Sequence, residues 1–546
     1  MQDHVSVRDF GATGDNSDTD TARIQAAIDS VKVGGVNEGR RVLFPEGGTY
    51  VCDRINCSGL QNVELVGYGA TITGPSTGRV GCYFDLSGAA DVVIEGFAFD
   101  GRAAALPAYT QADFAANNLT YNTPVIANGE TAAWSNITVR NCTLTGMYTN
   151  AVWAYRGSGV TVENNVFSAP VCTQTWHGIP AAQQYIFVML QTVGGQVSVT
   201  GNRFLGSATT NPALPPCGVF YSGITGPLLI ANNRADYCAR DNTGTHRLGV
   251  FDGYGDSRDV TIESNVCTNV MAQFGRMSAT AAGKVLNNAV HWSPNCEAGY
   301  NGFSVESTVV FGGQKGCQDI LIEGNTFDDP AARHAMAIGL LAYDWGAPLT
   351  DIRVIDNVFR SGGAAIKTYG PYYNLIIEGN QAPNASGTFL EVGPTPPGSR
   401  MTSVRGTEAN ATYDRLFVRR NLFRDTIARA NGIHLGLGAR TRAHVGLTVI
   451  EDNDLESTGG LGHAVVLIGR STNMTRNEII VRGNRIRGFA DYAYFRDGGR
   501  YIWQDNDCEG ATVTDYNDGG GYLSLELGGA RCRADGARSS GLGRHR

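Results

Sequence analysis

The stretch DILIEGNTF, residues 319–327, places Ile320 and Ile322 two positions apart and then ends on an asparagine, Asn325, ahead of Phe327. Apolar residues at every second position are typical of a β-strand with one buried face. The same phrase, an apolar residue followed by two variable residues and an asparagine, recurs along most of the chain. The asparagines are Asn165, Asn202, Asn233, Asn265, Asn325, Asn357, Asn380, Asn421, Asn453, Asn484 and Asn506. Two earlier copies, around Phe97 and Cys142, keep the strand but lack the asparagine.

A repeat with a period of roughly 20 to 50 residues is the sequence signature of a solenoid, whose coils share one continuous core. An asparagine at the same corner of each coil tolerates the left-handed backbone of a tight turn. Stacked asparagines can also hydrogen-bond to one another as a ladder. The frame of a leucine-rich repeat is absent, and a β-sandwich would not explain the period. The sequence therefore predicts an all-β fold, a right-handed single-stranded parallel β-helix.

The N-terminal stretch VSVRDFGATGDNSDTDTARIQAAIDSV, residues 5–31, resembles the first segment of the pectate-lyase-like β-helix superfamily. The matching residues are Asp9, Phe10, Gly11, Ala12, Gly14, Asp15, Asp18, Thr21, Ala22, Ile24, Gln25, Ala26 and Ala27. That superfamily includes phage tailspike depolymerases, polysaccharide lyases, rhamnogalacturonases and uronan epimerases. Its usual G-D-G-x-T-D-D-T becomes GDNSDTDT here, a departure confined to a turn. The resemblance implies a fold and a polysaccharide partner, but it does not imply one reaction.

The same stretch predicts an α-helix over about residues 19–31 that caps the solenoid. Residues 18–20 offer N-caps, and Ile24, Ala27, Ile28 and Val31 form one apolar face. A solenoid needs such a cap at an open end. We expect an N-terminal cap and first coils over residues 1–90, with VLFPEGGTYVC (42–52) starting the first coil. The β-helix would follow over 91–510 with an insertion near 270–317, and a strand and a flexible Gly- and Arg-rich tail over 511–546.

Composition excludes several function classes. The 546 residues carry a formal net charge of −8 and form no basic stripe, which argues against a nucleic-acid partner. No apolar run is long enough to span a membrane, and the first residues do not form a signal region. We therefore expect an extracellular protein, either a secreted mature chain or a phage virion component.

The 12 cysteines form no C-x-x-C metal pattern. Cys52 with Cys57, and Cys296 with Cys317, could form disulfides outside a cell, or they could be buried thiols. The sequence leaves both alternatives open.

In enzymes of the resembling superfamily, the substrate groove crosses a strand upstream of the asparagine strand. We expect inward-facing residues in this strand on successive coils at Val219, Val250, Ile366, Leu390, Ile433 and Val465. Because side chains alternate, the next residues would form an outward column of Phe220, Phe251, Lys367, Glu391, His434, Val466 and Phe495. Lys367 is one of few lysines in the chain, and Glu391 and His434 would be its neighbours on the following coils. A Lys–Glu pair on a sheet surface is also often a simple cross-strand ion pair.

Two further regions add candidates. Tyr343, Asp344 and Trp345 lie just upstream of the Lys367 strand, and Tyr369 is in that strand. The longest interval, between Asn265 and Asn325, is either a functional loop or an extra coil. It supplies His291, Trp292, Tyr300 and Glu306. Aromatic rings beside acids suit a sugar-binding cleft, and Tyr343, Trp345, Tyr369 and Trp292 are the predicted substrate-binding residues. Each aromatic could equally be a packing residue.

The favoured hypothesis is a glycoside hydrolase, in which two carboxylates flank the scissile bond. Candidate acids are Asp252, Asp256, Glu306, Asp344 and Glu391. The alternatives are a polysaccharide lyase and a non-catalytic glycan-binding spike or adhesin, with an epimerase after them. A lyase would use Lys367, His434 or a tyrosine as its base. No cofactor or metal site is predicted, although a lyase could use a divalent cation such as Ca²⁺ to neutralise the uronate carboxylate. The partner would be a polysaccharide, and the chain could form a homotrimer or remain a monomer.

Overall fold

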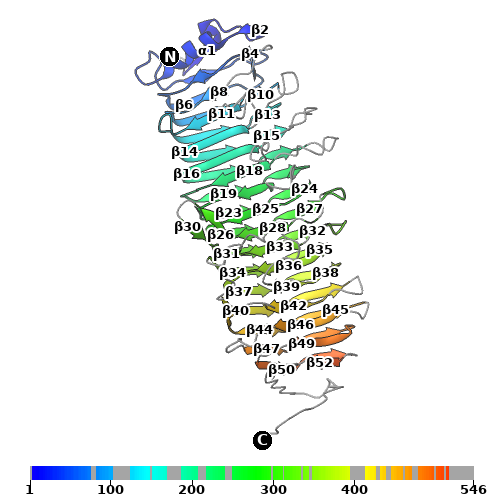
Figure 1. Cartoon of the computed structure of the whole chain (residues 1–546). Coiled ribbons are helices and arrows are strands. Elements are labelled where there is room, and N and C mark those ends of the chain that lie inside the picture. The colour runs from blue at the N-terminus through cyan, green and yellow to red at the C-terminus, as the bar shows by residue number, and fades with distance from the viewer. Residues whose placement is uncertain are drawn as a thin grey trace, which may run out of the picture. The chain divides into compact units, whose positions relative to one another are not determined.

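A computed structural model shows how the repeats are folded. It describes residues 3–75, 82–102, 123–147, 150–168, 186–206, 217–239, 249–296, 299, 301–310, 313–333, 336–342, 347–393, 412–425, 431–437, 444–458, 462–469, 478–496, 500–509 and 512–515. The chain forms two compact units. Unit 1 comprises Met1–Arg276 and Lys284–Glu297, and unit 2 comprises Met277–Gly283 and Ala298–Arg546. In each unit, parallel strands stack coil upon coil (Figure 1).

Unit 1 contains two parallel sheets. The first has β1 His4–Ser6, β3 Arg41–Leu43, β5 Ile55–Asn56, β6 Gln61–Val66, β8 Cys82–Asp85, β9 Ala90–Glu95, β11 Thr123–Asn128, β12 Ser135–Arg140, β14 Asn150–Glu163, β16 Ile186–Thr200, β18 Cys217–Ser222, β19 Leu228–Ala231, β21 Phe251–Gly253, β22 Ser257–Arg258 and β23 Val260–Glu263. The second has β2 Asp15–Thr19, β4 Thr49–Val51, β7 Thr71–Thr73, β10 Ala98–Asp100, β13 Thr143–Thr145, β15 Val166–Ser168, β17 Arg203–Leu205, β20 Arg234–Asp236, β24 Val266–Val270 and β27 Ala289–Trp292. β25 Gly275–Ser278 and β26 Thr280–Leu286 contain residues of both units.

Unit 2 repeats this arrangement. Its first sheet has β28 Asn301–Glu306, β31 Gln318–Glu323, β33 Met336–Leu341, β34 Leu349–Ile355, β36 Ala364–Tyr369, β37 Tyr372–Glu378, β39 Leu390–Gly393, β40 Thr412–Arg419, β42 Ile433–Leu437, β43 His444–Val445, β44 Thr448–Glu451, β46 His463–Gly469, β47 Glu478–Arg482, β49 Asp491–Arg496, β50 Arg500–Gln504 and β52 Thr512–Asp515. Its second sheet has β32 Thr326–Asp328, β35 Val358–Ser361, β38 Gln381–Ala385, β41 Leu422–Asp425, β45 Asp454–Ser457, β48 Arg485–Arg487 and β51 Asp507–Glu509. β29 Thr308–Val310 and β30 Gly313–Lys315 form an antiparallel hairpin.

The predicted asparagine ladder is present and fully buried in both units. Asn202, for example, accepts hydrogen bonds at Oδ1 from the Asn165 backbone N–H (2.9 Å) and Nδ2 (3.1 Å), and it donates in turn to Asn233. The long interval of the repeat is partly an extra coil, because Asn288 joins the ladder of unit 1 by accepting from Asn265 at 3.0 Å. The sequence VLNN ending at Asn288 fits the repeat, but it was not among the predicted copies.

The left-handed turn at the corner lies one residue before each ladder asparagine, and this corrects the prediction. The positive φ angles belong to residues such as Asn164 (55°), Ser264 (53°) and Arg420 (57°), or to glycines such as Gly324 (67°). The ladder asparagine itself is absent from the positive-φ residues of the described chain. Its side chain satisfies buried backbone groups of the neighbouring coils, and the residue before it makes the turn.

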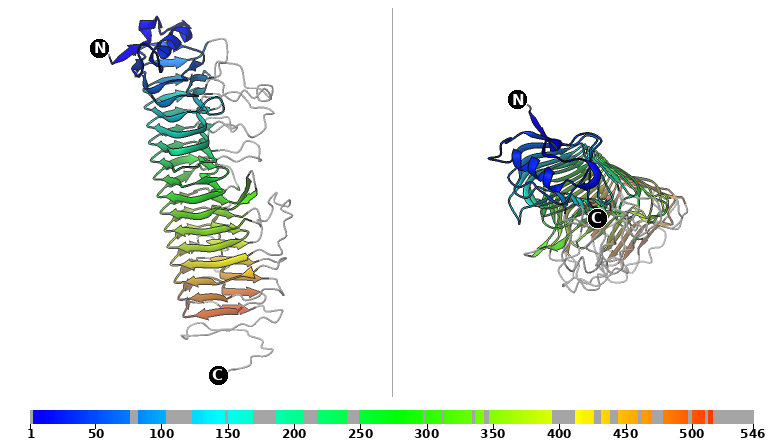
Figure 2. Two further views of the ribbon diagram at one scale, coloured as in Figure 1. Left: turned by 90° about the vertical axis from the view of Figure 1, so that its left-hand side faces the viewer. Right: turned by 90° about the horizontal axis from the view of Figure 1, so that it is seen from above.

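The cap helix of unit 1 is confirmed. α1 Thr21–Val31 follows the 3-10 helix η1 Val7–Phe10 and buries the predicted face of Ile24, Ala27, Ile28 and Val31 at the N-terminal end of this unit (Figure 2). Asp20 is the N-cap residue, but its carboxylate does not cap the helix. It accepts instead from the backbone N–H groups of Thr13 and Gly14, both at 3.0 Å, and so ties the preceding loop to the helix start.

The cysteines named in the sequence analysis are buried thiols. Cys52, Cys57 and Cys317 form no disulfide, so neither of the two proposed bridges exists in this structure. Burial also raises the pKa of the Cys142 and Cys317 thiols to about 12, which leaves them protonated and unreactive at neutral pH. Within the described ranges, no helix has the length and apolar character needed to cross a membrane.

Candidate functional site

The candidate site in unit 2 is an outward-facing column of side chains on successive strands of the first sheet. In β36, Ile366 is fully buried and Lys367 faces out, as the alternation predicts. The strand register sets Lys367 beside Glu391 of β39, and Glu391 beside His434 of β42. Neighbouring strands lie about 4.8 Å apart, so the three side chains are immediate neighbours on three coils.

Lys367 and Glu391 form an ion pair at the centre of this column. The Lys367 Nζ atom lies 2.9 Å from Glu391 Oε2, and both side chains are largely shielded, with about 19% and 22% of their surfaces exposed. An ammonium group has three N–H donors, and this contact uses one of them. The pair therefore places a cation on the sheet surface that retains the capacity to bind a second anion.

His434 is the next side chain in the column. Burial lowers the pKa of its imidazole, the Glu391 carboxylate acts in the opposite direction, and His463 and Lys367 lower it further. The ring is therefore neutral near pH 7 and able to accept a proton. Its Nε2 atom is buried and has no hydrogen-bond partner in the described part of the chain. A buried ring nitrogen without a partner is costly, because buried polar atoms are usually hydrogen-bonded.

Tyr369 and one glycine shape the surroundings of the ion pair. Tyr369 is buried against Met336 and Leu341, and burial together with the Glu391 charge raises the pKa of its phenol. Gly339 precedes Lys367 in the column, and a Cβ at this position would lie 3.0 Å from Met336 Sδ. A side chain therefore fits poorly at Gly339, so none covers the sheet on that side of Lys367.

The predicted carboxylates Glu306 and Asp252 are placed differently. Glu306 accepts a hydrogen bond from Ser304 Oγ at 2.6 Å, and its row on the sheet passes through Leu341 to Tyr369. Three strand spacings, or about 14 Å, and a further two residues along the strand separate its position from that of Glu391. Asp252, in unit 1, is completely buried and holds the guanidinium of Arg276 through two contacts of 2.8 and 2.9 Å. Such a geometry is that of a structural ion pair.

Comparison with known proteins agrees with this architecture. A family model described as "right handed beta helix region" matches residues 125–299. A tailspike double mutant of E. coli bacteriophage HK620, solved in complex with a pentasaccharide, superimposes with a TM-score of 0.50 at 14% identity, covering 87% of this chain and 78% of the tailspike. The chain is a right-handed parallel β-helix.

Other similar structures share less of the geometry with this β-helix. The surface adhesin PfbA of Streptococcus pneumoniae matches with a TM-score of 0.43 and 15% identity, over 86% of this chain and 93% of the adhesin. The A-module of the Azotobacter vinelandii mannuronan C-5 epimerase AlgE6 matches with a TM-score of 0.38 and 14% identity, over 93% and 99% of the two chains. No curated protein matches the sequence.

Two predicted members of the column, Phe251 and Phe495, take other positions in the strand register. The register pairs Phe220 with Asp252, so Asp252 is in the outward column and Phe251 points into the core, where it is fully buried. In unit 2 the register likewise assigns Tyr494, and not Phe495, to the column.

The predicted substrate-binding aromatics are only partly described. Trp292 is buried in unit 1, and its ring N–H donates to the Ala272 carbonyl at 2.6 Å, so it belongs to the core. Tyr369 is also buried, although it is next to the Lys367 column. Tyr343, Asp344 and Trp345 lie outside the described residues, as does Tyr300.

Unit 1 of the β-helix has an aromatic surface that sequence reasoning missed. Trp153 and Tyr155 alternate along β14, face out, and stack with ring centroids 6.0 Å apart. Trp153 donates from its ring N–H to Gln191 Oε1 at 3.2 Å. The register continues this face from Trp153 to Met189 and Phe220, which are half-buried. The alternation in NAVWAYRG (150–157) was available in the sequence, but the predicted column began only at Phe220.

Within the described ranges, no group of three or more His, Cys, Asp and Glu side chains is arranged to hold a metal ion. The described site presents the polar side chains of Lys367, Glu391, His434 and Tyr369.

Proposed function

We propose that this chain is a polysaccharide lyase that cleaves uronate-containing glycans by β-elimination at the Lys367 column. The observation that supports this most strongly is the neutral, half-buried imidazole of His434 next to the Lys367–Glu391 ion pair. A base and a cation side by side are what this reaction requires, because the proton is removed from the carbon that bears the carboxylate.

The elimination uses the side chains of the column and one water molecule. His434 takes the proton from C5 of the uronate, and the electron pair of that C–H bond forms the C4–C5 double bond. The C4–O bond of the glycosidic linkage breaks, and the leaving oxygen takes a proton from water. The unused N–H donors of Lys367 bind the substrate carboxylate and stabilise the negative charge that develops on it. Glu391 orients Lys367 and keeps the pKa of His434 from falling further.

Hydrolysis has weaker support from the described residues. A glycoside hydrolase places two carboxyl groups about 5 to 9.5 Å apart. The strand positions of Glu306 and Glu391 are more than about 14 Å apart, because three strand spacings and two residues along the strand separate them. Asp252 is buried in its ion pair with Arg276, and Asp344 lies outside the described residues. Hydrolysis by paired carboxylates stays a prediction.

The aromatic surface of unit 1 favours a second candidate function, glycan binding without cleavage. Stacked Trp153 and Tyr155, with Gln191 beside them, offer an apolar face and a polar edge, which is what a sugar ring needs. The structurally similar tailspike was solved with a pentasaccharide. That observation concerns the tailspike, and the proposal for this chain rests on its own residues.

The test is digestion of polygalacturonate, alginate and a glucuronate-containing glycan, with a neutral glucan as the control substrate. A lyase produces the ultraviolet absorbance of an unsaturated uronate together with new reducing ends. His434→Gln should reduce that rate by about a hundredfold or more, because it removes the base. His4→Gln, at a histidine in β1 of unit 1, is the matched control and should cleave at the wild-type rate. New reducing ends without the absorbance would mean hydrolysis, and binding without any product would mean a glycan-binding protein.

A further inference from the structure

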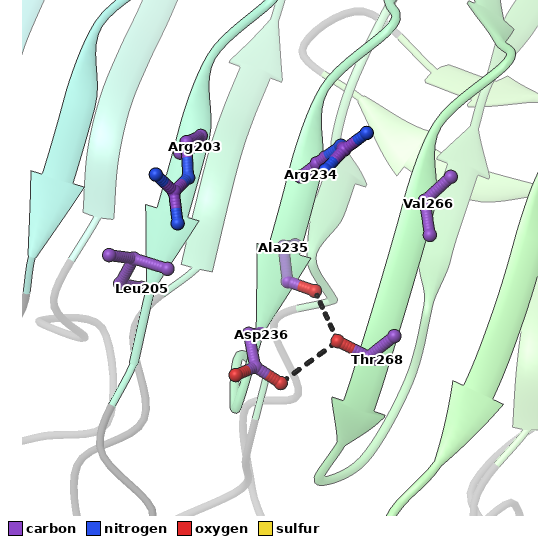
Figure 3. A pocket seen from close by; sticks show the side chains of 7 residues that line it. All are labelled: Arg203, Leu205, Arg234, Ala235, Asp236, Val266 and Thr268. Atoms are coloured by element: carbon purple, nitrogen blue, oxygen red, sulfur yellow. Dashed lines mark hydrogen bonds between the residues drawn. The ribbon is translucent and has the colours of Figure 1, made fainter.

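A pocket of about 450 Å³ lies on the second sheet of unit 1 (Figure 3). It is formed by three successive short strands, β17, β20 and β24. Its lining residues are Arg203, Leu205, Arg234, Ala235, Asp236, Val266 and Thr268. Its volume lies within the range of about 300 to 1,000 Å³ that is typical of small-ligand sites.

Two arginines lie directly opposite each other in this pocket. The strand register pairs Arg203 with Arg234, and both side chains are exposed. Val166 and Val266 are their outer neighbours in the same column, so no carboxylate flanks the pair. Across the described ranges, neither guanidinium forms an ion pair or hydrogen bond with a protein group. Like charges directly opposite on neighbouring strands destabilise a sheet.

In unit 2, an arginine that follows a ladder asparagine is paired with a carboxylate. Arg485, like Arg203, directly follows a ladder asparagine, and it lies 3.6 Å from Asp454 on the preceding coil. Arg424, in the other outward column of that sheet, contacts Asp454 at 2.7 Å and Glu456 at 3.0 Å. In the equivalent column of unit 2, Arg485 therefore has a carboxylate on the neighbouring coil, whereas in unit 1 two positive charges are adjacent.

The carboxylate within the pocket is already engaged by neutral donors. Asp236 Oδ1 accepts hydrogen bonds from Thr268 Oγ1 at 2.9 Å and from Asn269 Nδ2 at 2.8 Å. Figure 3 shows the two guanidinium groups on one side and Asp236 on the other. Val266, with 42% of its surface exposed, adds an apolar patch beside the arginines. The pocket thus combines a cationic edge, an apolar patch and hydrogen-bonding groups.

We propose that this pocket binds a carboxylate-bearing sugar unit of an acidic polysaccharide. The carboxylate would lie between the guanidinium groups of Arg203 and Arg234, whose planar forks match carboxylate geometry. The sugar ring would lie on Val266, and its hydroxyls would reach Thr268 and Asp236. Binding would replace a repulsion with two charge-assisted contacts. The inference goes beyond the proposed function, because the pocket would hold an acidic glycan whether or not the chain cleaves one.

The test is calorimetric binding of an oligogalacturonate, carried out in the His434→Gln background so that cleavage cannot consume the ligand. Arg203→Gln combined with Arg234→Gln should weaken binding by at least about tenfold, since each charge-assisted contact contributes about that much. Arg258→Gln is the control for the loss of one positive charge, because Arg258 is exposed in unit 1 but lies on a strand of the other sheet. It should be compared with Arg203→Gln and with Arg234→Gln, each made alone. The double variant should melt at or above the wild-type temperature without ligand, because a repulsion is removed.

Three further ligands distinguish binding of an acidic sugar chain from binding of any sugar or of any anion. A neutral oligoglucan should bind equally to the wild-type and double-variant pockets. Monomeric galacturonate and inorganic phosphate should bind at least about tenfold more weakly than the oligomer, because they lack the contacts of the chain. Equal binding of the oligogalacturonate by the double variant and the wild type would refute the proposal. Binding of phosphate as tight as that of the oligomer would also refute it, since the pocket would then be a simple anion site.

Discussion

Asn380→Ala removes one rung of the asparagine ladder in unit 2. Asn380 is fully buried and accepts from the Asn357 backbone N–H and Nδ2, both at 3.0 Å. Its own Nδ2 donates to the carbonyls of Val354 (2.8 Å) and Glu378 (3.1 Å) and to Asn421 Oδ1 (3.1 Å). Alanine would leave the buried Asn357 N–H without an acceptor and two carbonyls without this donor.

The cost can be worked from these contacts. A buried donor left unpaired costs about 1 to 3 kcal/mol, and each hydrogen bond lost from the carbonyls costs about 0.5 to 1.5 kcal/mol. We therefore expect the opening free energy of the coil to fall by about 3 kcal/mol or more. Since 1.4 kcal/mol is a factor of ten, amide protection in β37 and β38 should fall by about a hundredfold or more in hydrogen exchange.

Asn384→Ala is the matched control, because Asn384 is exposed and lies in β38, the strand that directly follows the rung. Surface substitutions usually change stability by less than about 0.5 kcal/mol, so exchange should hardly change there. Coil stabilities in a solenoid depend on nearest neighbours, so the loss in Asn380→Ala should be local to that coil and the next. Equal exchange in the two variants would show that the ladder contributes nothing to stability, and the reasoning would fail.

Three further predictions concern charge and binding. Glu391→Gln should lower the pKa of His434, and Lys367→Met should raise it. The acid limb of kcat/KM should therefore shift to lower pH in the first variant and to higher pH in the second. Shifts in the same direction would contradict His434 as the base. Trp153→Ala should weaken glycan binding by about fivefold in affinity electrophoresis, from the loss of about 1 kcal/mol of aromatic contact, and unchanged mobility would exclude this surface. Asp252→Ala should lower the unfolding free energy by about 3 kcal/mol, because its buried partner loses its counter-charge, while the folded fraction keeps its turnover. A loss of turnover without a loss of stability would return Asp252 to the catalytic candidates.

Much of the fold could be predicted because its signals repeat. The apolar alternation and the asparagine occur on coil after coil, so a misjudged copy does not change the conclusion. The inward positions Ile366, Leu390 and Ile433 follow from that alternation and are fully buried. The neighbourhood of Lys367, Glu391 and His434 follows from the same alignment, since parallel strands bring equivalent positions of successive coils together.

The errors arose where one local pattern fits two registers. In LGVFDGYG, residues 248–255, either Val250 or Phe251 can occupy the inward position, because both are apolar. A slip of one residue moves every side chain to the other face, and only pairing with β18 decides it. Trp292 was misplaced for another reason. The interval between Asn265 and Asn325 contains an additional coil. Trp292 lies in that coil and is buried, whereas a loop residue would have been exposed.

Stacking of equivalent positions gives one physical account of the ladder and both charged sites. Each side chain of a coil has a neighbour about 4.8 Å away on the next coil. The hydrogen bonds and charges of the two side chains are therefore balanced within the pair or by a third group. Asparagines satisfy each other, and Lys367 satisfies Glu391 while leaving donors unused. Arg203 and Arg234 cannot satisfy each other, and unit 2 shows that a carboxylate is acceptable at such a position. An anionic ligand would therefore be stabilised twice at the unbalanced pair, because its binding removes a repulsion and also forms contacts.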